Sequence, residues 1–311
     1  MTSRLLQPGM KIKKRYVIGS KLGEGTYGTV WKGRDTVWND DVAIKVVKKA
    51  TSNIDKDDET AVGEARILSM LSGCPGTPNL YEYFSWRKHN VIIMELLRGD
   101  FLSLLEHHPQ QKLSRKTVLH FAFHLVTTLE AVHSYGILHR DVKLANVMLP
   151  LKQTPTVKLV LGDFGFGYKF ESNLKRKGMR LRVPSRDYDY TLSTYHSLRM
   201  NRGQPAQEVD DLEMASYTIL ETVNIRPFLG RTMPDVVHVK EQFLFNPRPW
   251  LTTETSYLTN VITLLLNQEY GQSPDYEKVY KKIRSLNRNV SINRNFVLGR
   301  APNGCHFIKD F

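Results

Sequence analysis

Three closely spaced glycines, Gly23, Gly25 and Gly28, form the segment GEGTYGTV between two predicted strands. Because these positions lack side chains, a hairpin built on them can fold over phosphate groups and offer backbone N–H groups to them. The same spacing also marks dinucleotide-binding folds, where it lies between a strand and a helix. Here residues 29–31 continue into another strand, so the context favours a phosphate-binding hairpin.

Lys45 lies in the segment VAIK, on a predicted strand that is otherwise rich in Val and Ile. On the outer face of a sheet it would be an ordinary surface lysine. If it faces inward it requires an anionic partner, and Glu64 on the next predicted helix is the natural candidate. Such an ion pair would hold the ammonium toward phosphate oxygens. The acids within residues 55–59 precede the apolar stripe of that helix and suit its solvated first turn better.

The segment ILHRDVKLANVML, residues 137–149, follows directly after a long predicted helix. It contains Asp141, Lys143 and Asn146, and Asp163 begins an Asp-Phe-Gly sequence further along. These motifs, in this order and after the glycine hairpin and the strand lysine, resemble those of the protein kinase family. The resemblance runs from about residue 16 to residue 286.

The resemblance implies separate roles for these four residues in phosphoryl transfer, with ATP and Mg²⁺ as cofactors. Asp141 would accept a hydrogen bond from the acceptor hydroxyl and take its proton, while Lys143 would neutralise the γ-phosphate. Asn146 and Asp163 would hold Mg²⁺, which prefers hard oxygen ligands. An isolated aspartate in a turn would have no such role, but Asp141 is surrounded by the other three.

The resemblance also implies an adenine site, in which Met94 would be the gatekeeper and the backbone of Glu95 and Leu97 would face the adenine edge. Val30, Ala43 and Met148 would enclose the ring, although each could equally be an ordinary core residue. The full set of nucleotide-binding residues expected is Leu22, Gly23, Gly25, Gly28, Val30, Ala43, Lys45, Glu64, Met94, Glu95, Leu97 and Met148.

Two further features indicate the branch of the family. Serine/threonine kinases typically carry a lysine at the position of Lys143, so the acceptor is expected to be Ser or Thr. No Ala-Pro-Glu follows the activation segment; instead residues 196–203 and 209–221 resemble the casein kinase 1 superfamily, including its vaccinia-related and tau-tubulin branches. In this alignment Asp211 would brace the backbone of the catalytic loop.

The chain departs from that superfamily at two places. Glu208 and Val209 stand where many members carry paired arginines, which argues against a phosphate site there. A Gly-Thr pair usually precedes the substrate site, but here the candidates are Thr191 and Thr194, and the threonine that contacts the catalytic aspartate stays unassigned.

The fold predicted from these patterns is α+β, a two-lobed protein kinase fold. Short β-branched runs separated by turns predict strands at residues 16–22, 29–35, 41–47, 80–86 and 90–96. Apolar positions spaced by three and four predict helices at residues 57–71, 114–135, 210–223, 254–267 and 275–286. The smaller lobe, a sheet with one key helix, would then precede a larger and mostly helical lobe.

Changes in periodicity set the expected boundaries within the domain 16–286. The N-lobe spans about residues 16–95, the hinge 95–99 and the C-lobe 100–286. Residues 1–15 form an N-terminal extension, and residues 287–311 form a C-terminal tail that is expected to pack on the C-lobe.

Composition limits the remaining possibilities. The 311 residues are 41% hydrophobic, enough for a substantial core, but no apolar run approaches the ~20 residues that a membrane helix needs. Only Cys74 and Cys305 could form disulfides, and they lie far apart in the sequence. With no signal-like apolar stretch at the start, the expectation is an intracellular monomer, cytoplasmic or nuclear, with no membrane partner.

The formal net charge of +13 includes a basic run, residues 174–186, that contains no acidic residue. Within the predicted activation segment this run favours protein substrates that are acidic or already phosphorylated, or a bound activating phosphate. Direct nucleic-acid binding is a weaker alternative because the run lacks interleaved aromatics. A pseudokinase scaffold is the rival function, and the retention of Gly23, Lys45, Asp141 and Asp163 argues against it.

Overall fold

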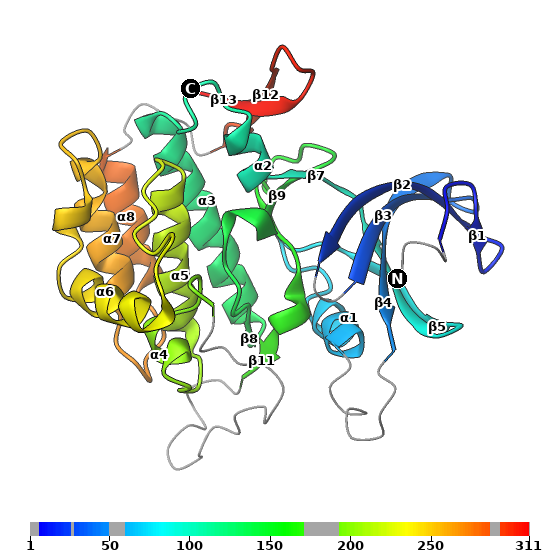
Figure 1. The fold of residues 1–311 in the computed structure, drawn as a ribbon, viewed down its shortest axis with the longest axis horizontal. Helices are drawn as coiled ribbons and strands as arrows, with labels where there is room; N and C mark the ends of the chain where they lie inside the picture. Colours follow the sequence, from blue (N-terminus) through cyan, green and yellow to red (C-terminus); the bar gives the residue numbers. More distant parts are fainter. Residues whose placement is uncertain (1–5, 26–27, 50–59, 171–192, 287–292, 311) are drawn as a thin grey trace.

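The computed structural model describes residues 6–25, 28–49, 60–170, 193–286 and 293–310. Figure 1 shows two lobes joined by the segment that leads from β6 to α2, with a curled sheet in the smaller lobe and most of the helices in the larger one. The predicted two-lobed α+β fold is confirmed. No helix within the described ranges is long and apolar enough to cross a membrane.

An antiparallel sheet of order β1-β2-β3-β4-β6-β5 builds the smaller lobe. Its strands are β1 (Lys11–Ile12), β2 (Tyr16–Gly25), β3 (Gly28–Asp35), β4 (Asp40–Lys48), β5 (Leu80–Trp86) and β6 (His89–Glu95). Each of the five strands predicted from the sequence is present, with Gly23 and Gly25 at the end of β2 and Gly28 at the start of β3.

Alternation along β4 decides which side chains reach the second lobe. Val42, Ile44 and Val46 point to one face of the sheet and join its hydrophobic cluster. Since side chains alternate along a strand, Ala43 and Lys45 point to the opposite face. That face is covered by helix α1 (Thr60–Met70), which buries an apolar stripe against the sheet.

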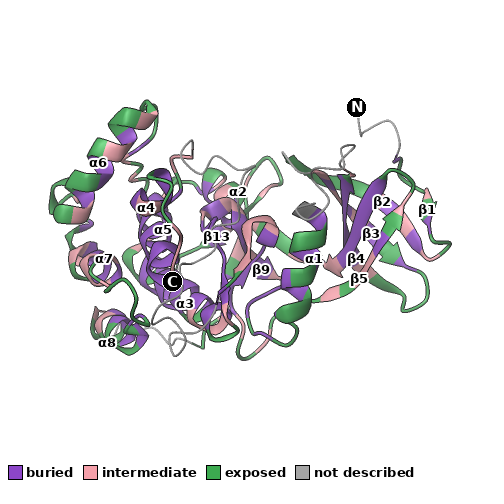
Figure 2. Ribbon diagram, turned by 90° about the horizontal axis from the view of Figure 1, so that it is seen from below, coloured by how far each residue is buried: buried purple, intermediate pink, exposed green. Residues whose placement is uncertain are grey.

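The larger lobe is assembled around two buried helices, α3 (Arg115–Ser134) and α5 (Glu208–Glu221). The Ser114 hydroxyl caps α3, and Gly136 ends it with φ +72°. The remaining helices are α2 (Phe101–Glu106), α4 (Leu198–Asn201), α6 (Met233–Phe245), α7 (Thr259–Leu266) and α8 (Tyr276–Leu286). Figure 2 shows α3 largely buried and α5 buried along its whole length.

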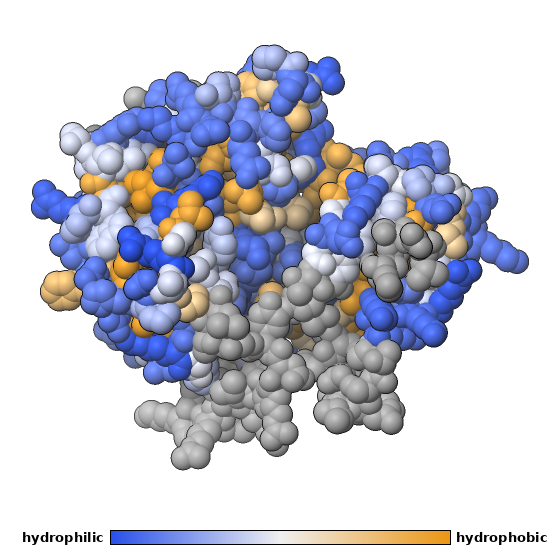
Figure 3. Space-filling view, viewed as in Figure 1, coloured by the Kyte–Doolittle hydropathy of each residue, from blue (hydrophilic) through white to orange (hydrophobic). Residues whose placement is uncertain are grey.

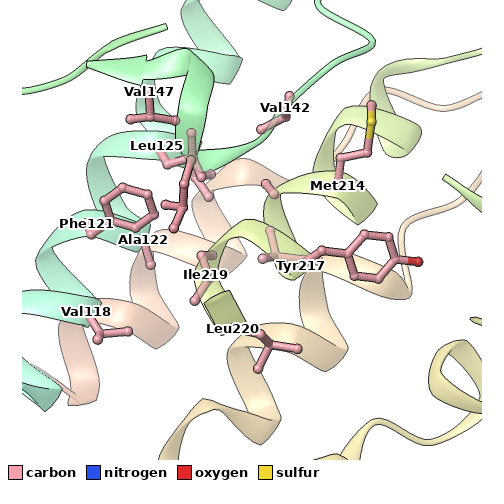
Figure 4. Close-up of a cluster of buried hydrophobic side chains, with 14 of the residues drawn as sticks. Val118, Phe121, Ala122, Leu125, Val142, Val147, Met214, Tyr217, Ile219 and Leu220 are labelled. Atoms are coloured by element: carbon pink, nitrogen blue, oxygen red, sulfur yellow. The ribbon is translucent and has the colours of Figure 1, made fainter. Parts of the chain in front are cut away.

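Two small sheets, one of three strands and one of two, complete the larger lobe next to the hinge. They are β7 (Leu97–Asp100) with β9 (Val147–Pro150) and β10 (Val160–Leu161), and β8 (Ile137–Leu138) with β11 (Tyr168–Lys169). Figure 4 shows Val142 and Val147 beside the core residues of α3 and α5. The segment between these two valines is therefore anchored at both ends in a rigid core.

Helix α6 was not predicted from the sequence, and a buried lysine explains why. Its buried positions Val236, Val239, Lys240 and Phe243 have helical spacing, but the lysine breaks the apolar stripe. Lys240 is fully buried and donates to Asn201 Oδ1 at 2.7 Å and to the His196 carbonyl. Burial lowers the pKa of Lys240 to about 7, although the negative charge of Glu213 acts to raise it.

Residues 293–310 contain a hairpin, β12 (Val297–Arg300) and β13 (His306–Lys309), which lies beside α2 (Figure 1). Phe296 is buried against the rings of Phe101 and His120, with centroids 5.3 and 4.8 Å away. Asp310 Oδ1 accepts a hydrogen bond from the Ser114 backbone N–H at 2.7 Å. These contacts attach the segment to the start of α3 and to α2.

Candidate active site

Lys45 is held between two carboxylates where the lobes meet. Its Nζ lies 2.7 Å from Glu64 Oε2 and 2.8 Å from Asp163 Oδ1, and its side chain is 9% exposed. Burial works to lower the pKa of Lys45, but the charges of Glu64 and Asp163 outweigh it and leave the pKa above its ordinary value. The ammonium therefore stays charged, and the predicted pairing of Lys45 with Glu64 is confirmed.

Glu64 and Asp163 respond to this arrangement in opposite ways. Burial raises the pKa of Glu64, and the charge of Lys45 only partly offsets the rise. Burial also acts to raise the pKa of Asp163, but the charge and hydrogen bond of Lys45 overcome it and hold the pKa below its usual range. Asp163 is thus the more firmly ionised of the two carboxylates, which suits a metal ligand.

The catalytic-loop residues converge on Asp141. Asp141 Oδ2 accepts hydrogen bonds from Lys143 Nζ at 2.7 Å and from Asn146 Nδ2 at 2.9 Å. The same amide nitrogen donates to the Asp141 carbonyl at 2.8 Å, which fixes the orientation of Asn146. Both bonds to the carboxylate use Oδ2, so neither of them occupies Oδ1 among the residues that the structure describes.

The backbone that carries Asp141 is held by Asp211 on α5. Asp211 accepts hydrogen bonds from the backbone N–H groups of His139 and Arg140, both at 2.7 Å. Arg140 has φ +66°, a conformation that is costly for a residue with a side chain and that persists only where the surroundings enforce it. The bracing role predicted for Asp211 is confirmed by these contacts.

His139 links the catalytic loop to the Asp-Phe-Gly segment. Its Nδ1 accepts from the Asp141 backbone N–H at 3.2 Å, and its Nε2 bonds the Gly162 carbonyl at 2.9 Å. The ring also meets Phe164 edge-on, with centroids 4.7 Å apart. Asp163 itself has φ +56°, so its left-handed backbone turns the carboxylate toward Lys45.

The three glycines of the hairpin differ in how much space surrounds them: the fold requires a glycine at one position, and the other two have free space beside the backbone. A Cβ at Gly28 would overlap the Val46 carbonyl oxygen of the neighbouring strand, so a side chain is excluded there. Gly23 and Gly25 have no atom within 4 Å of the position that a Cβ would take. Their backbone is therefore accessible to a ligand from that side, as a phosphate-binding turn requires.

The residues predicted to surround adenine come from both lobes. Ala43 pairs with Met94 across β4 and β6, and Met148 approaches Gly162 directly before Asp163. The Glu95 backbone N–H donates to the Asn79 carbonyl at 2.9 Å, so that donor is engaged within the protein. Leu97 opens β7, Val30 is half-buried and Leu22 is exposed.

Some predicted features lie outside the described residues, namely the basic run 174–186 and Thr191. Glu208 and Val209, which stand where many casein kinase 1 members carry paired arginines, are buried at the start of α5.

His133 was not predicted as part of the site. Its Nε2 lies 2.9 Å from Asp211 Oδ2 and its Nδ1 contacts the Tyr276 hydroxyl, and only the packing of α3 on α5 reveals it.

The side chains present fit a magnesium nucleotide. Asn146 uses its Nδ2 toward Asp141 and Asp163 binds Lys45 through Oδ1, so within the described part of the chain these bonds leave the Asn146 amide oxygen and Asp163 Oδ2 for another ligand. Carboxylate and amide oxygens are hard donors, and Mg²⁺ typically takes one or two from a protein and completes its shell with water and phosphate oxygens. The buried ammonium of Lys45 next to them suits a polyanionic ligand.

We expect replacement of Asp211 with asparagine to lower the free energy of unfolding by about 3 to 5 kcal/mol at neutral pH, because buried donors would lose their charged acceptor. Burial acts to raise the pKa of Asp211, but His133 outweighs it and keeps the pKa below its ordinary value. Such a group stabilises the fold above its unfolded-state pKa and loses that effect as pH falls through the folded-state pKa. Urea denaturation at neutral pH and at about pH 3 should therefore show the deficit shrinking in acid. Equal stability of variant and wild type at neutral pH would contradict this role.

Comparisons with known proteins agree with this geometry. The protein kinase domain family matches residues 16–189, which is more than half of the chain. Casein kinase I homolog RAG8 of Kluyveromyces lactis is 29% identical over 205 residues, covering 65% of this chain and 36% of that protein. The chain thus spans about a third of the length of this curated relative. The solved structure of vaccinia related kinase 3 superposes with a TM-score of 0.72 at 17% identity, covering 94% of this chain and 95% of the other.

The structural neighbour establishes the fold, and the match to the protein kinase domain family establishes which family the chain belongs to. The matched segment includes the glycine hairpin, the Lys45–Glu64 pair, the catalytic loop around Asp141, and Asp163. The curated relative is named as a casein kinase I homolog and the structural neighbour as a vaccinia related kinase, two names among the branches that the motifs had indicated. The chain therefore belongs to the protein kinase family.

Proposed function

We propose that the chain is a serine/threonine protein kinase that transfers the γ-phosphoryl group of ATP to a protein hydroxyl. The observation that carries this proposal is the state of the Asp141 carboxylate. One of its oxygens accepts from Lys143 and Asn146, and the other carries neither bond. A buried carboxylate fixed in this way is well suited to accept the proton of a hydroxyl.

Bound Mg²⁺ and ATP would supply the phosphoryl group and the metal charge that neutralises its oxygens. The chain's own residues would hold that group in line with the acceptor. Lys45, fixed by Glu64, would bind phosphate oxygens, and the hairpin around Gly23 and Gly25 would cover them with N–H groups. Asn146 and Asp163 would supply the oxygen ligands, and Lys143 would balance the negative charge near the acceptor.

The acceptor class rests on two supports. Lys143 stands two residues after Asp141, as is typical of serine/threonine kinases, and it contacts that aspartate directly. The curated relative is named as a casein kinase I homolog. Against a pseudokinase role, Gly23, Lys45, Asp141 and Asp163 are all retained, and Lys45 and Asp141 keep charged partners.

An acidic or phosphorylated substrate is the proposed specificity. The chain carries a formal net charge of +13, and the activation segment contributes the acid-free run 174–186. In the face seen in Figure 3, hydrophilic side chains are spread over both lobes. Excess positive charge attracts acidic partners, and this attraction becomes weaker as the salt concentration rises because salt screens it.

The experiment that tests the proposed function is product analysis. The purified chain is incubated with Mg²⁺, γ-labelled ATP and dephosphorylated casein, and the labelled amino acid is identified after hydrolysis. Phosphoserine or phosphothreonine is expected, and chelation of the metal should abolish the label. Label found only on tyrosine, or only on a small-molecule alcohol, would contradict the proposal.

A further inference from the structure

An ion pair that the phosphoryl-transfer machinery does not use lies at the end of α5. Arg226 Nε is 3.1 Å from Glu221 Oε1, in the loop that leaves the helix. The loop is held in place by a hydrogen bond from the Ile225 backbone N–H to the Leu220 carbonyl at 3.0 Å, and Asn224 takes φ +60° within it. Arg226 therefore has a defined position relative to the helix.

This pair lies on the side of α5 that supports the catalytic loop. Thr218, one turn before Glu221, donates its hydroxyl to the Val142 carbonyl at 3.1 Å, and Val142 directly follows Asp141. Residues three apart on a helix share a face, so Glu221 continues the surface that meets the loop. The Glu221–Arg226 pair thus lies one helical turn beyond the contact that joins α5 to the catalytic loop.

Tyr195 connects the two electrostatically. Its side chain is partly exposed, at 41%. Burial and the Glu221 carboxylate raise the pKa of Tyr195, Arg226 lowers it, and Asp141 adds a smaller increase. The charges of Glu221, Arg226 and Asp141 therefore all act on this phenol.

The two partners of the pair present themselves to solvent very differently. The Glu221 side chain is 8% exposed, whereas that of Arg226 is 34% exposed. A ligand approaching from outside meets the guanidinium rather than the carboxylate. Because Nε makes the contact with Glu221, the terminal nitrogens of the fork are the donors closest to a bidentate anionic ligand.

We propose that Arg226 is a specificity-determining residue that binds an acidic or phosphorylated side chain flanking the acceptor residue of the substrate. This inference rests on the proposed protein kinase function and names a second source of acidic preference, separate from residues 174–186. The opposite reading, a basic substrate residue bound by Glu221, would require displacement of a guanidinium from a nearly buried carboxylate.

The test uses a serine peptide with neutral flanks and a set in which Asp, phosphoserine or Lys replaces each flanking position singly. At low ionic strength the wild type should prefer an acidic residue at one position by about 3- to 10-fold in kcat/KM, the size expected of a partly exposed ion pair. Arg226→Gln combined with Glu221→Gln removes both charges and leaves no unpaired carboxylate buried. This variant should lose the preference at that position.

Two further variants sharpen the result. Glu221→Gln alone keeps the guanidinium and should retain the acidic preference. Arg231→Ala removes the same charge from the same loop, where the Arg231 side chain donates to the Pro227 carbonyl, and should leave the peptide profile unchanged. Thermal melts of all variants establish that they are folded.

The possible outcomes separate the inference from the function. Peptide turnover with no acidic preference, or with a preference that the double variant retains, overturns the role of Arg226 and leaves the kinase proposal intact. A preference for Lys that Glu221→Gln abolishes also overturns it, in favour of a basic substrate. A wild-type protein that phosphorylates no protein or peptide overturns the proposed function and this inference with it.

Discussion

Replacement of Asp141 with asparagine should lower kcat for protein phosphorylation by about 10²- to 10⁴-fold, the range attributed to a positioned general base. The two side chains have the same shape, and the amide oxygen can still accept from Lys143 and Asn146. The variant therefore keeps the loop but lacks a proton acceptor. Initial rates with γ-labelled ATP, measured beside the wild type from parallel purifications, give the ratio.

Binding and stability provide the controls for this variant. Asp141 contacts neither Lys45 nor Asp163 in the described hydrogen bonds and ion pairs, so nucleotide affinity and melting temperature should change little. A variant that incorporates as much label as the wild type would show that another protein supplies the activity. Loss of folding together with activity would assign Asp141 a structural role only.

The second large effect is expected at Asp163. Asp163→Asn keeps an oxygen for Lys45 but removes the negative charge, and the fall in kcat should be at least about 10²-fold, as for loss of other preorganised charge stabilisation. The affinity for ATP should also lose its dependence on Mg²⁺, because a neutral amide is a weaker ligand for that ion. Calorimetric titration of ATP with and without Mg²⁺ measures this directly.

Asp41→Asn is the matched control for Asp163. Asp41, like Asp163, forms an ion pair with the smaller lobe's sheet, here with Lys32 at 2.8 Å and Arg34 at 2.9 Å, but it lies near the start of β4 and away from Lys45. Removal of one carboxylate from that ion-pair network should change activity and ATP affinity by less than about twofold. Equal effects of the two substitutions would mean that Asp163 acts only through general electrostatics.

Much of the smaller lobe could be predicted from the sequence because its signals are local. Short β-branched runs and turns define β2 to β6, and the period of two explains why Lys45 faces α1. Its partner followed from the position of Glu64 on the apolar side of the next helix. The prediction succeeded here because each residue's orientation depends on its own strand or helix.

The contacts that the sequence did not reveal depend on packing between distant segments. His133 on α3 forms a hydrogen bond with Asp211 on α5, and these two residues lie 78 positions apart in the sequence. Helix α6 was hidden by Lys240, whose burial is possible only because Asn201 and the His196 carbonyl accept its hydrogen bonds. Arg226 looks like an ordinary surface arginine until Glu221 is seen beneath it. For His133 and Lys240 the partner lies far along the chain, whereas the partner of Arg226 is at the end of the preceding helix and is brought close by the turn that follows it.

The most direct test of the central claim is a crystal structure of the chain with Mg²⁺ and a non-hydrolysable ATP analogue. We predict a metal bound to oxygens of Asn146 and Asp163 at about 2.0 to 2.1 Å, phosphate oxygens on Lys45, and the terminal phosphate facing Asp141. A nucleotide bound elsewhere, or a metal with no ligand from these two residues, would contradict the account.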